Sequence, residues 1–577
     1  MIKNQKKWLP ICLSLAVVTV MFLLAGPLTA DEGMWTLDNM PMKQLKEKYG
    51  FEPTPAWLEH IRLASVRVGD GGSGSFVSPN GLVLTNHHVA LGQLQKVSTP
   101  QKNYVSDGFY AATAAEELPC PDLELNVLIS MANVTAKIMA AVKPGMAANK
   151  ALEARKAAIA AIERQSLKKT GLRSDVVKLY NGGEYWLYRY KKYTDVKLVF
   201  APEQQAAFYG GDPDNFTFPR HDLDMALFRA YEKGKPAVVS HYLKWSANGA
   251  ADGELVFISG HPGSTNRLLT LAQIQFQREY SYPMRLKYYK RLLEVAKQYA
   301  SQGMEQARQA AGMIFGIENG IKVTSGEYDG LNTGILEKKA ASEAEFRKLV
   351  EAAPKWKEAY ADAWEQISAA IEKQKPRMKE LYYRRIPGLR LGGIAQQIVQ
   401  YVSEIKKPDG KRLEGFHDSE LESLRFRLFS RAPIYPGLEE AMIINSLKLQ
   451  LEELGPEDPF VQAALGGKTP EEAAKALIAG SKLADPAFRR KLVEGGEAAV
   501  ENCTDSFIVL ARKLDPMVRE LKKWQEDNIE SIARPAGEKI GQALFAVYGK
   551  NAYPDATFTL RLSYGTGKQA EAQRFEL

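Results

Sequence analysis

The chain has 577 residues, of which 45% are hydrophobic and 25% are charged, and its formal net charge is +8. These fractions are typical of a globular protein and exclude a disordered or fibrous chain, and the length suits about two to four domains. The positive charge is small for this length, and no cluster of Lys and Arg is interleaved with aromatic residues, which argues against a nucleic-acid partner.

The N-terminus has the pattern of a transport signal. Three lysines within the first seven residues precede an apolar run over residues 9–25, and small residues then lead to Ala30. A basic start, an apolar core and a small-residue junction predict a secretory signal peptide over residues 1–30, cleaved after Ala30. An uncleaved membrane anchor is the alternative, because the run approaches the ~18 residues that span a bilayer. No second run is as hydrophobic, so we expect no stable membrane span after cleavage.

Cysteine usage limits how the fold can be stabilised. Beyond the predicted signal peptide only Cys120 and Cys503 remain, so the mature chain can form one disulfide at most. No cluster of Cys and His residues has the spacing of a structural zinc site, and we expect neither a metal nor a cofactor. Buried cores must therefore stabilise the fold.

The part of the chain that follows the signal is predicted to be mainly β. Apolar runs on both sides of Asn80-Gly81 predict a hairpin, because Asn-Gly favours the tight turn that joins two strands. A segment rich in Ala, Glu and Lys over residues 150–167 predicts a helical insertion. Further strands are expected at residues 63–68, 176–180, 184–190, 196–200, 225–231 and 254–258, and we expect the last two to complete a barrel.

Residues 268–541 are patterned almost entirely as helices. The segment Thr469-Pro470-Glu471-Glu472 fits a capping box, with proline at the first helical position. Asp485-Pro486 predicts the start of another helix, and Gly495-Gly496 predicts its end.

The segment after the helices returns to a β pattern. Residues 557–564 alternate as a half-buried strand does. A single strand cannot bury itself, so we expect a second β-unit to begin here.

Two segments carry side chains that could perform acid–base chemistry. Residues 72–89 contain the predicted hairpin, and two adjacent histidines, His87 and His88, follow its second strand. A histidine at the end of a rigid strand can transfer protons at the rim of a cleft, although two strand-end histidines bonded to backbone would give the same pattern. Residues 209–224 form a glycine-rich polar loop that ends in Asp224, directly before an apolar strand. A buried aspartate there can orient a histidine, although alone it could equally cap a turn.

Together these segments resemble a known family. Ser78-Pro79-Asn80-Gly81-Leu82-Val83-Leu84-Thr85-Asn86-His87-His88 is similar to the histidine region of chymotrypsin-like proteases, and Asp224-Met225-Ala226-Leu227-Phe228 is similar to their aspartate region. The narrower resemblance is to the bacterial dipeptidyl-peptidase 7 and 11 family. It extends over residues 31–35, 260–267 and 553–565, so it covers nearly the whole mature chain.

The resemblance implies an α+β fold, a chymotrypsin-like double β-barrel with a large inserted α-helical domain. On this division residues 31–267 form the first barrel with its helical insertion, residues 268–545 form the helical cap domain, and residues 546–577 begin an incomplete second barrel. The resemblance also implies a location in the periplasm, at the cell surface or outside the cell. Family members are often dimeric, so a homodimer is an expectation from the resemblance alone.

The resemblance also assigns roles to single residues. It implies that His88, rather than the histidine before it, is the general base of a serine peptidase, and that Asp224 orients it. Asn215 would hold the free α-amino group of a peptide substrate, so that two residues are removed at a time from the N-terminus. The aromatic residue beside it, usually tryptophan in the family, is Phe216, which keeps a packing surface without the indole N–H.

Two departures from the family pattern bear on activity. Family members often carry cysteines at the positions of Gly72 and Val89, so the loss of one disulfide is expected. The family's nucleophile lies in a Gly-Asn-Ser-Gly-Ser segment downstream of the strand that matches residues 557–564, and no such segment occurs before Leu577. We therefore expect a C-terminally truncated chain that does not hydrolyse peptides by itself.

Other serines are weaker candidates for the nucleophile, which needs its hydroxyl within hydrogen-bond reach of the base. Ser264, in Gly-His-Pro-Gly-Ser, follows a strand, but the resemblance places it in a structural turn. Ser73 and Ser75 are expected to bond backbone groups in the first hairpin.

Two other functions stay open at this point. The glycine- and serine-rich segment over residues 72–81 also suits an HtrA-like serine endopeptidase, although the long helical region and the lack of a β-rich PDZ-like tail argue against it. A non-catalytic peptide-binding relative would keep Asn215 and the cleft but not the serine.

Overall fold

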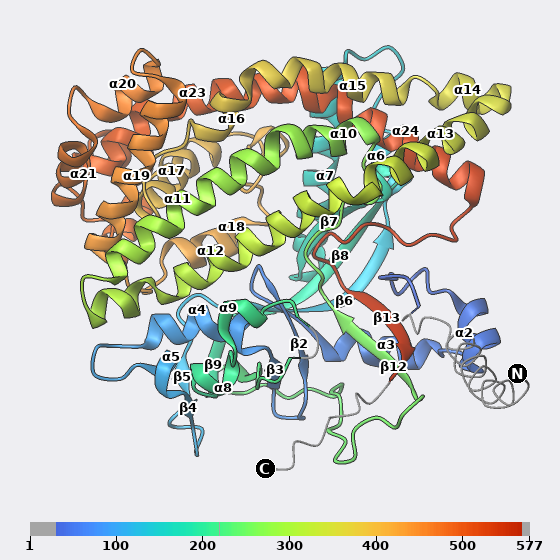
Figure 1. The fold of residues 1–577 in the computed structure, drawn as a ribbon, viewed down its shortest axis with the longest axis horizontal. Coiled ribbons are helices and arrows are strands. Elements are labelled where there is room, and N and C mark those ends of the chain that lie inside the picture. Colours follow the sequence, from blue (N-terminus) through green and yellow to red (C-terminus); the bar gives the residue numbers. More distant parts are fainter. Residues whose placement is uncertain (1–30, 218–219, 568–577) are drawn as a thin grey trace, which may run out of the picture.

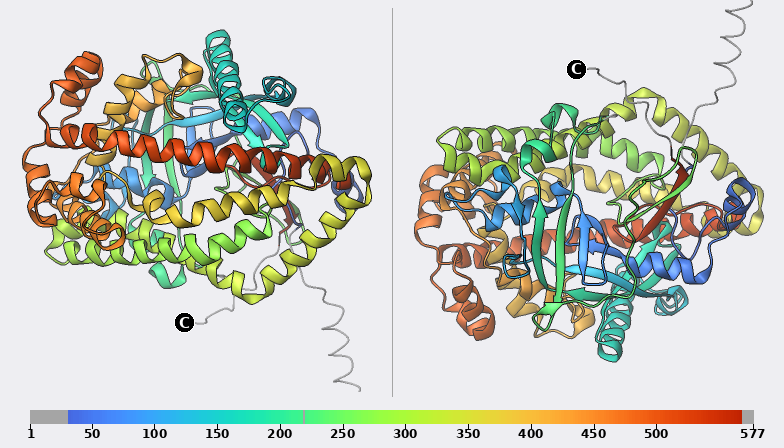
Figure 2. Two further views of the ribbon diagram at one scale, coloured as in Figure 1. Left: turned by 90° about the horizontal axis from the view of Figure 1, so that it is seen from above. Right: turned by 90° about the horizontal axis from the view of Figure 1, so that it is seen from below.

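The computed structural model of the chain describes residues 31–217 and 220–567. The predicted signal peptide lies outside the described residues. The fold is α+β, as expected, with a large antiparallel sheet against an extensive layer of helices (Figure 1). Seen from above, the long helices lie in front, and seen from below, the strands do (Figure 2).

Eleven strands form one antiparallel sheet in the order β4-β9-β10-β3-β2-β1-β6-β8-β7, with β11 beside β10 and β5 beside β9. The strands are β1 Ser65–Val68, β2 Gly72–Phe76, β3 Leu82–Thr85, β4 Phe109–Tyr110, β5 Leu118–Pro119, β6 Leu125–Asn133, β7 Arg173–Leu179, β8 Glu184–Tyr193, β9 Asp195–Ala201, β10 Ala226–Glu232 and β11 Lys235–Pro236. The strands expected at 176–180, 184–190, 196–200 and 225–231 are thus confirmed, whereas the segment 63–68 becomes a strand only at Ser65. Fully buried apolar side chains form the core of this sheet, among them Val66, Val83, Leu125, Leu198 and Phe228.

The hairpin predicted around Asn80-Gly81 is confirmed. β2 and β3 pair in the register Gly74↔Thr85, Ser75↔Leu84, Phe76↔Val83. Gly81 has φ +68°, and a Cβ there would lie 2.8 Å from the carbonyl oxygen of Ala230, so the turn requires glycine. The hairpin therefore packs closely against β10, the strand that follows Asp224.

One strand does not lie where the sequence suggested. We expected residues 254–258 to complete the first barrel, but β12 (Leu255–Gly260) pairs with β13 (Arg561–Thr566) in a separate two-stranded sheet. The alternation of a strand indicates which face is buried but not which strand lies beside it, and this partner follows the whole helical region. The second β-unit therefore begins before the helices and resumes after them.

The helical region starts after β12. Its α-helices are α10 Leu271–Phe276, α11 Tyr282–Ala300, α12 Met304–Gly330, α13 Leu336–Ala352, α14 Pro354–Tyr360, α15 Ala363–Gln374, α16 Met378–Tyr383, α17 Leu391–Glu404, α18 Leu421–Leu428, α19 Pro436–Leu454, α20 Pro459–Leu465, α21 Pro470–Ala479, α22 Pro486–Glu501, α23 Ser506–Gln525 and α24 Ser531–Tyr548. The capping box predicted at Thr469 is confirmed. Gly495-Gly496 was expected to end a helix but kinks α22 instead: Gly496 has φ +66° and ψ −156°, which glycine tolerates, and helical structure resumes up to Glu501.

Further helices accompany the sheet: α2 Met42–Tyr49, α3 Pro55–Ala64, α4 His87–Val97, α5 Tyr104–Asp107, α6 Thr135–Met139, α7 Ala148–Thr170, α8 Gln204–Ala207 and α9 Gly211–Asp214. The helix α7 confirms the helical insertion expected over residues 150–167. Cys120 and Cys503 are both free, so the disulfide that the sequence allowed is not formed. No described helix is long and apolar enough to cross a membrane, and no described group of three or more His, Cys, Asp or Glu side chains could hold a metal ion.

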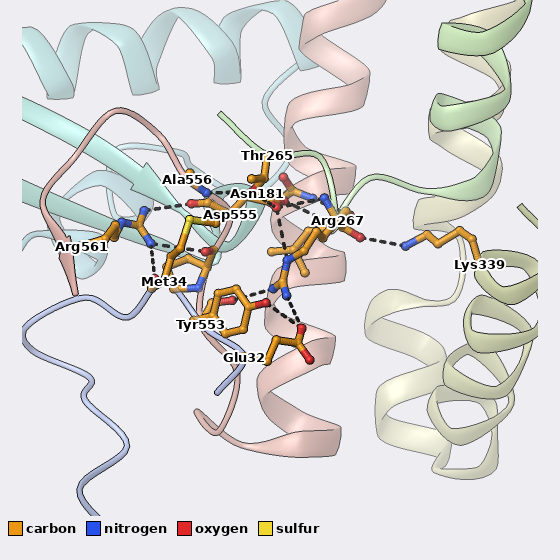
Figure 3. Close-up of polar contacts among 12 residues, drawn as sticks. Glu32, Met34, Asn181, Thr265, Arg267, Lys339, Tyr553, Asp555, Ala556 and Arg561 are labelled. Carbon is orange, nitrogen blue, oxygen red and sulfur yellow. Dashed lines mark hydrogen bonds and ion pairs between the residues drawn. The ribbon is translucent and has the colours of Figure 1, made fainter. Parts of the chain in front are cut away.

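The chain leaves the β12–β13 sheet and returns to it at neighbouring positions (Figure 3). After β12, the backbone N–H groups of Arg267 and Leu268 donate to the carboxylate of Asp555 at 2.9 Å each. The buried Arg561, the first residue of β13, donates to the carbonyl oxygen of Asp555, also at 2.9 Å. The Arg267 guanidinium lies 3.7 Å from the centre of the Tyr553 ring. These contacts join the outgoing and returning segments, so β12 and β13 stay paired across the helical insertion.

Candidate active site

The register of the large sheet brings His88 and Asp224 together. Thr85, the last residue of β3, pairs with Ala226, the first residue of β10. His88 follows Thr85 by three residues, in the first turn of α4, and Asp224 precedes Ala226 by two. Because β3 and β10 are antiparallel, both side chains emerge at the same end of the sheet.

The aspartate holds the histidine by two contacts. Nδ1 of the His88 ring lies 2.7 Å from Oδ2 of Asp224, and the His88 backbone N–H donates to Oδ1 at 3.0 Å. The side-chain amide of Asn86 donates to the carbonyl oxygen of Asp224 at 3.1 Å and to Oδ2 at 3.2 Å. Asn86 was not predicted as a site residue, although its place directly before the two histidines was visible in the sequence.

The pair has the electrostatics of a base and an orienting acid. Burial alone would raise the pKa of Asp224, but hydrogen bonds from the His88 ring and backbone outweigh it and hold that pKa below its ordinary value. Asp224 is therefore ionised at neutral pH and can stabilise a protonated imidazole. The His88 side chain is 48% exposed, and with Nδ1 engaged its Nε2 is the atom that can exchange a proton with a bound group.

The adjacent His87 is placed differently. It is 3% exposed, and burial lowers its pKa, so the ring stays neutral. Its Nε2 has no hydrogen-bond partner among the described residues. The structure therefore places only His88 in hydrogen-bond contact with the aspartate.

Asn215 lies beside a residue of the helical region. It follows α9, is 9% exposed, and its Nδ2 donates to Oδ1 of Asn319 on α12 at 3.1 Å. Arg220 donates to Oδ1 of Asn215 at 3.3 Å. Asn319 was not predicted as a site residue, because one asparagine within a long helix gives no sequence signal.

Lys322 holds the loop of Asn215 against α12. Its Nζ donates to the carbonyl oxygen of Asp212, to that of Pro213 at 3.3 Å and to that of Asn215 at 3.0 Å. Phe216, which follows Asn215 in the sequence, is 64% exposed and has φ +65°. Its ring is therefore presented to solvent rather than to a core. The loop between β9 and β10 thus meets α12 at Asn215.

Positions 72 and 89, where family members often carry a disulfide, are neighbours behind the histidine. A Cβ at Gly72 would lie 2.3 Å from Cγ1 of Val89. The valine side chain therefore occupies the space between the two positions, and an apolar contact stands where the disulfide would be.

The candidate nucleophiles form no hydrogen bond with the base among the described residues. No serine among the described residues hydrogen-bonds to the His88 ring. Oγ of Ser73 accepts a backbone N–H just after β12 at 2.8 Å, and Ser75 lies within β2. Ser264 forms an isolated antiparallel backbone bridge with Thr557, which ties it to the segment that leads into β13. The described residues therefore supply a base and its orienting acid, without a serine in contact.

Known proteins are similar to this chain in sequence and in fold. The sequence model of Peptidase S46 matches residues 30–573. An Asp/Glu-specific dipeptidyl-peptidase of Shewanella putrefaciens is 28% identical over 589 aligned residues, covering 96% of this chain and 78% of the relative. A dipeptidyl-peptidase 7 of Capnocytophaga gingivalis is 26% identical, covering 96% of this chain and 80% of the relative. A crystal structure of Porphyromonas endodontalis DPP11 with the dipeptide Arg-Asp has the same fold, with a TM-score of 0.72 at 22% identity over 93% of this chain and 80% of that one.

Proposed function

The chain belongs to the Peptidase S46 family, and we propose that it is a serine-type dipeptidyl-peptidase, which releases dipeptides from the free N-termini of peptides. The observation that carries this proposal is the 2.7 Å contact between Nδ1 of His88 and Oδ2 of Asp224, in the loop that also bears Asn215. Two relatives that match 96% of the chain are named dipeptidyl-peptidases, which supports the same activity.

In the proposed reaction, Nε2 of His88 takes the proton of a serine hydroxyl as its oxygen attacks the carbonyl carbon of the substrate's second peptide bond. The imidazolium then gives this proton to the leaving amine as the bond breaks, which leaves the dipeptide esterified to the serine. Water, deprotonated by the same histidine, hydrolyses the ester and releases the dipeptide. Asp224 holds the Nδ1–H tautomer and stabilises the imidazolium in both steps.

Removal of two residues requires a group that binds the α-ammonium of the substrate. We assign Asn215 to this role, together with Asn319, whose Oδ1 lies 3.1 Å from the Asn215 amide. Side-chain carbonyl oxygens can accept ammonium N–H groups, and the exposed ring of Phe216 offers a face for cation–π contact beside them. A substrate held by its amine presents its second peptide bond to His88, rather than an interior bond.

The proposal extends to architecture, location and assembly. The two sheets are the cores of two chymotrypsin-like barrels, residues 268–545 cap the cleft, and residues 546–577 belong to the second barrel. The β12–β13 pair supports this, because it forms a sheet of its own, separate from the eleven-stranded sheet. Residues 1–30 would direct the protein to the periplasm, the cell surface or the medium, so the exported protein should begin at Asp31. The proposed assembly is a homodimer, which sedimentation measures directly.

The activity is tested with peptide pairs that differ only in a free or an N-acetylated N-terminus. Protein expressed from the whole reading frame should release dipeptides from the unblocked peptide only. His88→Ala should abolish release and leave peptide binding intact. An HtrA-like endopeptidase would cleave both peptides, so equal cleavage of the acetylated peptide would contradict the proposal.

A non-catalytic peptide-binding relative is the second candidate, because no described serine hydrogen-bonds to His88. Such a protein would bind unblocked peptides and release no dipeptide from them. The same assay tests whether residues 1–577 alone can complete the reaction, which we expect they cannot. Dipeptide release by this chain would contradict that expectation, and its loss in Ser264→Ala would identify Ser264 as the nucleophile.

A further inference from the structure

A groove extends from His88 between the large sheet and the helical region. It has a volume of about 580 Å³, which is within the range of ligand-binding clefts. Its sheet wall is formed by α4, by the turn between β1 and β2 and by residues 122–124, and its helical wall is formed by residues 390–397 and 427–428, in and around α17 and α18 (Figure 1). Among the described residues that line the groove, none belongs to α12.

The proposed amine site sets the direction of a bound substrate. When the α-ammonium is held at Asn215 and Asn319, the first two residues of the peptide lie between α12 and His88. The bond that is cleaved then lies beside His88, and the residues beyond it must continue away from α12. The groove begins at His88 and reaches α18 without touching α12, so it offers that path.

Glycines keep the groove open on both walls. Gly71 in the turn between β1 and β2, Gly92 on α4 and Gly393 on α17 all line it. A Cβ on any of these three residues would have no atom within 4 Å. Gly92 and Gly393 lie within helices, where glycine is less favourable than alanine. A peptide main chain can therefore lie close to both walls.

The charges of the sheet wall disfavour a bound anion. Lys96 forms an ion pair with Asp122 at 2.6 Å, so its charge is already matched. Glu124 lies 3.4 Å from the guanidinium of Arg173, behind the wall. Asp70, in the turn between β1 and β2, is exposed and would repel a carboxylate. An anion in the groove is therefore favoured only on the helical wall.

The helical wall carries two arginines, and they differ in how they are engaged. Nη1 of Arg390 donates to the carbonyl oxygen of Pro433 at 2.8 Å, and its charge attracts the nearby carboxylate of Glu439. Arg427, near the end of α18, is exposed, and its side chain has neither a hydrogen bond nor an ion pair among the described residues. Of the described cations that line the groove, Arg427 is therefore the one that can bind an anion without losing a partner.

A peptide that leaves His88 along this groove brings an anion with it, because its last residue carries the C-terminal carboxylate. Arginine binds carboxylates through paired, charge-assisted hydrogen bonds. An extended main chain advances by about 3.3 Å per residue, so the carboxylate lies at the level of Arg427 for one peptide length only. The number of residues beyond the cleaved bond therefore decides whether the contact forms.

We propose that this groove receives the residues beyond the cleaved bond and that Arg427 binds the C-terminal carboxylate of short peptides. The inference rests on the proposed function, because the amine must sit at Asn215 and Asn319 for the leaving part of the substrate to enter the groove. Arg427 thus acts as a specificity residue that favours oligopeptides of one length over longer chains.

Calorimetric titration of the whole 577-residue chain tests this proposal with alanine peptides of three to six residues, each as the free acid and as the C-terminal amide. At one length we expect the free acid to bind about 5-fold more tightly than the amide, because an exposed ion pair with good geometry contributes that much. The preference should shrink in 1 M NaCl, which screens an exposed pair. A preference below about 2-fold at every length would overturn the proposal.

Variants on α18 assign the preference to one side chain. Arg427→Gln should abolish it and leave the affinity for the amides unchanged, whereas Arg427→Lys should keep part of it. Arg425→Gln is the matched control, because it removes an exposed arginine of the same helix that lines a different cavity. An unchanged preference in Arg427→Gln would contradict the role of Arg427.

A groove-filling variant tests the path of the leaving residues separately. Gly393→Leu should weaken binding of the preferred peptide by at least ~10-fold and leave the dipeptide Ala-Ala unaffected, because the dipeptide ends before the groove. Leucine forms helices better than glycine does, so α17 should stay folded. Gly326→Leu is the matched control: it makes the same change on α12, outside the groove, at a position that is also free of atoms within 4 Å. Unchanged binding of the preferred peptide to Gly393→Leu would contradict the proposed path.

Failure of this inference can be told apart from failure of the proposed function. N-terminal acetylation and Asn215→Ala test the amine site, whereas C-terminal amidation and the variants of Arg427 and Gly393 test the groove. If the first two weaken binding but the others have no effect at any length, only the role of the groove is wrong. If neither acetylation nor Asn215→Ala matters, the proposed function itself is wrong.

Discussion

The two halves of the site are held in place by different means. His88 and Asp224 are fixed by the backbone ladder between β3 and β10, in which Thr85 lies opposite Ala226. Asn215 is instead fixed by side chains of α12, which follow it by more than a hundred residues. One half thus depends on a buried sheet, and the other depends on a few side-chain contacts between distant parts of the chain.

Proton transfer and substrate binding should therefore respond to different perturbations. Backbone pairs within a buried sheet are among the last contacts of a fold to open, whereas partly exposed side-chain contacts open at much lower cost. Substitutions near Asp224 should therefore change the rate of the reaction, and substitutions on α12 should change the affinity for peptides.

Asp224→Asn should have the largest effect. The amide cannot hold the Nδ1–H tautomer of His88 or stabilise the imidazolium, so hydrolysis should fall roughly 10⁴-fold. Binding of unblocked peptide should be unchanged, since the Asn215 half stays intact. Single-turnover hydrolysis by protein expressed from the whole reading frame and calorimetric titration measure the two quantities separately, and a parallel loss of binding would show that the halves are not independent.

Acid pH should weaken the junction between the two sheets. His261, directly after β12, donates its backbone N–H to Ser73 of β2 and is 4% exposed. Burial lowers the pKa of its ring from 6.5 to about 3. Because the unfolded chain binds more protons between these two pKa values, stability is lost as the pH falls through that window. At pH 5 the loss due to His261 should be about 2 kcal/mol relative to neutral pH.

Urea unfolding at pH 7.5 and pH 5 measures this contribution. His261→Gln should reduce the pH dependence of the free energy of unfolding by that amount, whereas His221→Gln, at an exposed position, should leave it unchanged. The same pH dependence in wild type and His261→Gln would contradict the burial of this ring. A smaller pH dependence in His261→Gln than in wild type would show that the second β-unit stabilises the sheet that bears His88.

Lys322→Met should weaken peptide binding, because Lys322 holds the Asn215 half of the site. Loss of the ammonium leaves the carbonyl oxygens of the Asn215 loop without their donor, so the dissociation constant for unblocked peptides should rise about 10-fold. The hydrolysis rate at saturating peptide should not change. Lys338→Met, at an exposed position on α13, serves as the control, and a fall in kcat without a change in affinity would contradict the comparison.

Asn86→Ala should have the smallest effect. Asn86 contacts Asp224 from the solvent side, so its loss should lower hydrolysis by roughly threefold through poorer orientation of the carboxylate. Peptide affinity should be unaffected, and the same titration checks it. A loss of hydrolysis as large as that in Asp224→Asn would mean that Asn86, rather than the β3–β10 register, positions the acid.

Local patterns in the sequence predicted much of this fold. The turn at Asn80-Gly81 and the capping box at Thr469 depend on residues a few positions apart, so both could be recognised without tertiary information. Resemblance to a family then selected His88 over its neighbour, and the structure places only that ring against the aspartate.

Long-range contacts could not be predicted in the same way. The pairing of β12 with β13 joins segments on either side of the helical region, and alternation within either strand does not name its partner. Asn319 becomes a site residue only because α12 lies against the Asn215 loop.

The central claim is that this chain binds a free peptide N-terminus at Asn215, beside the His88–Asp224 pair. Calorimetric titration of the 577-residue chain with one peptide, unblocked and N-acetylated, tests it most directly. We expect wild type to prefer the unblocked peptide by at least about 10-fold, and Asn215→Ala to lose that preference, because the ammonium loses charge-assisted hydrogen bonds. Equal affinity of wild type for the two peptides would contradict the account.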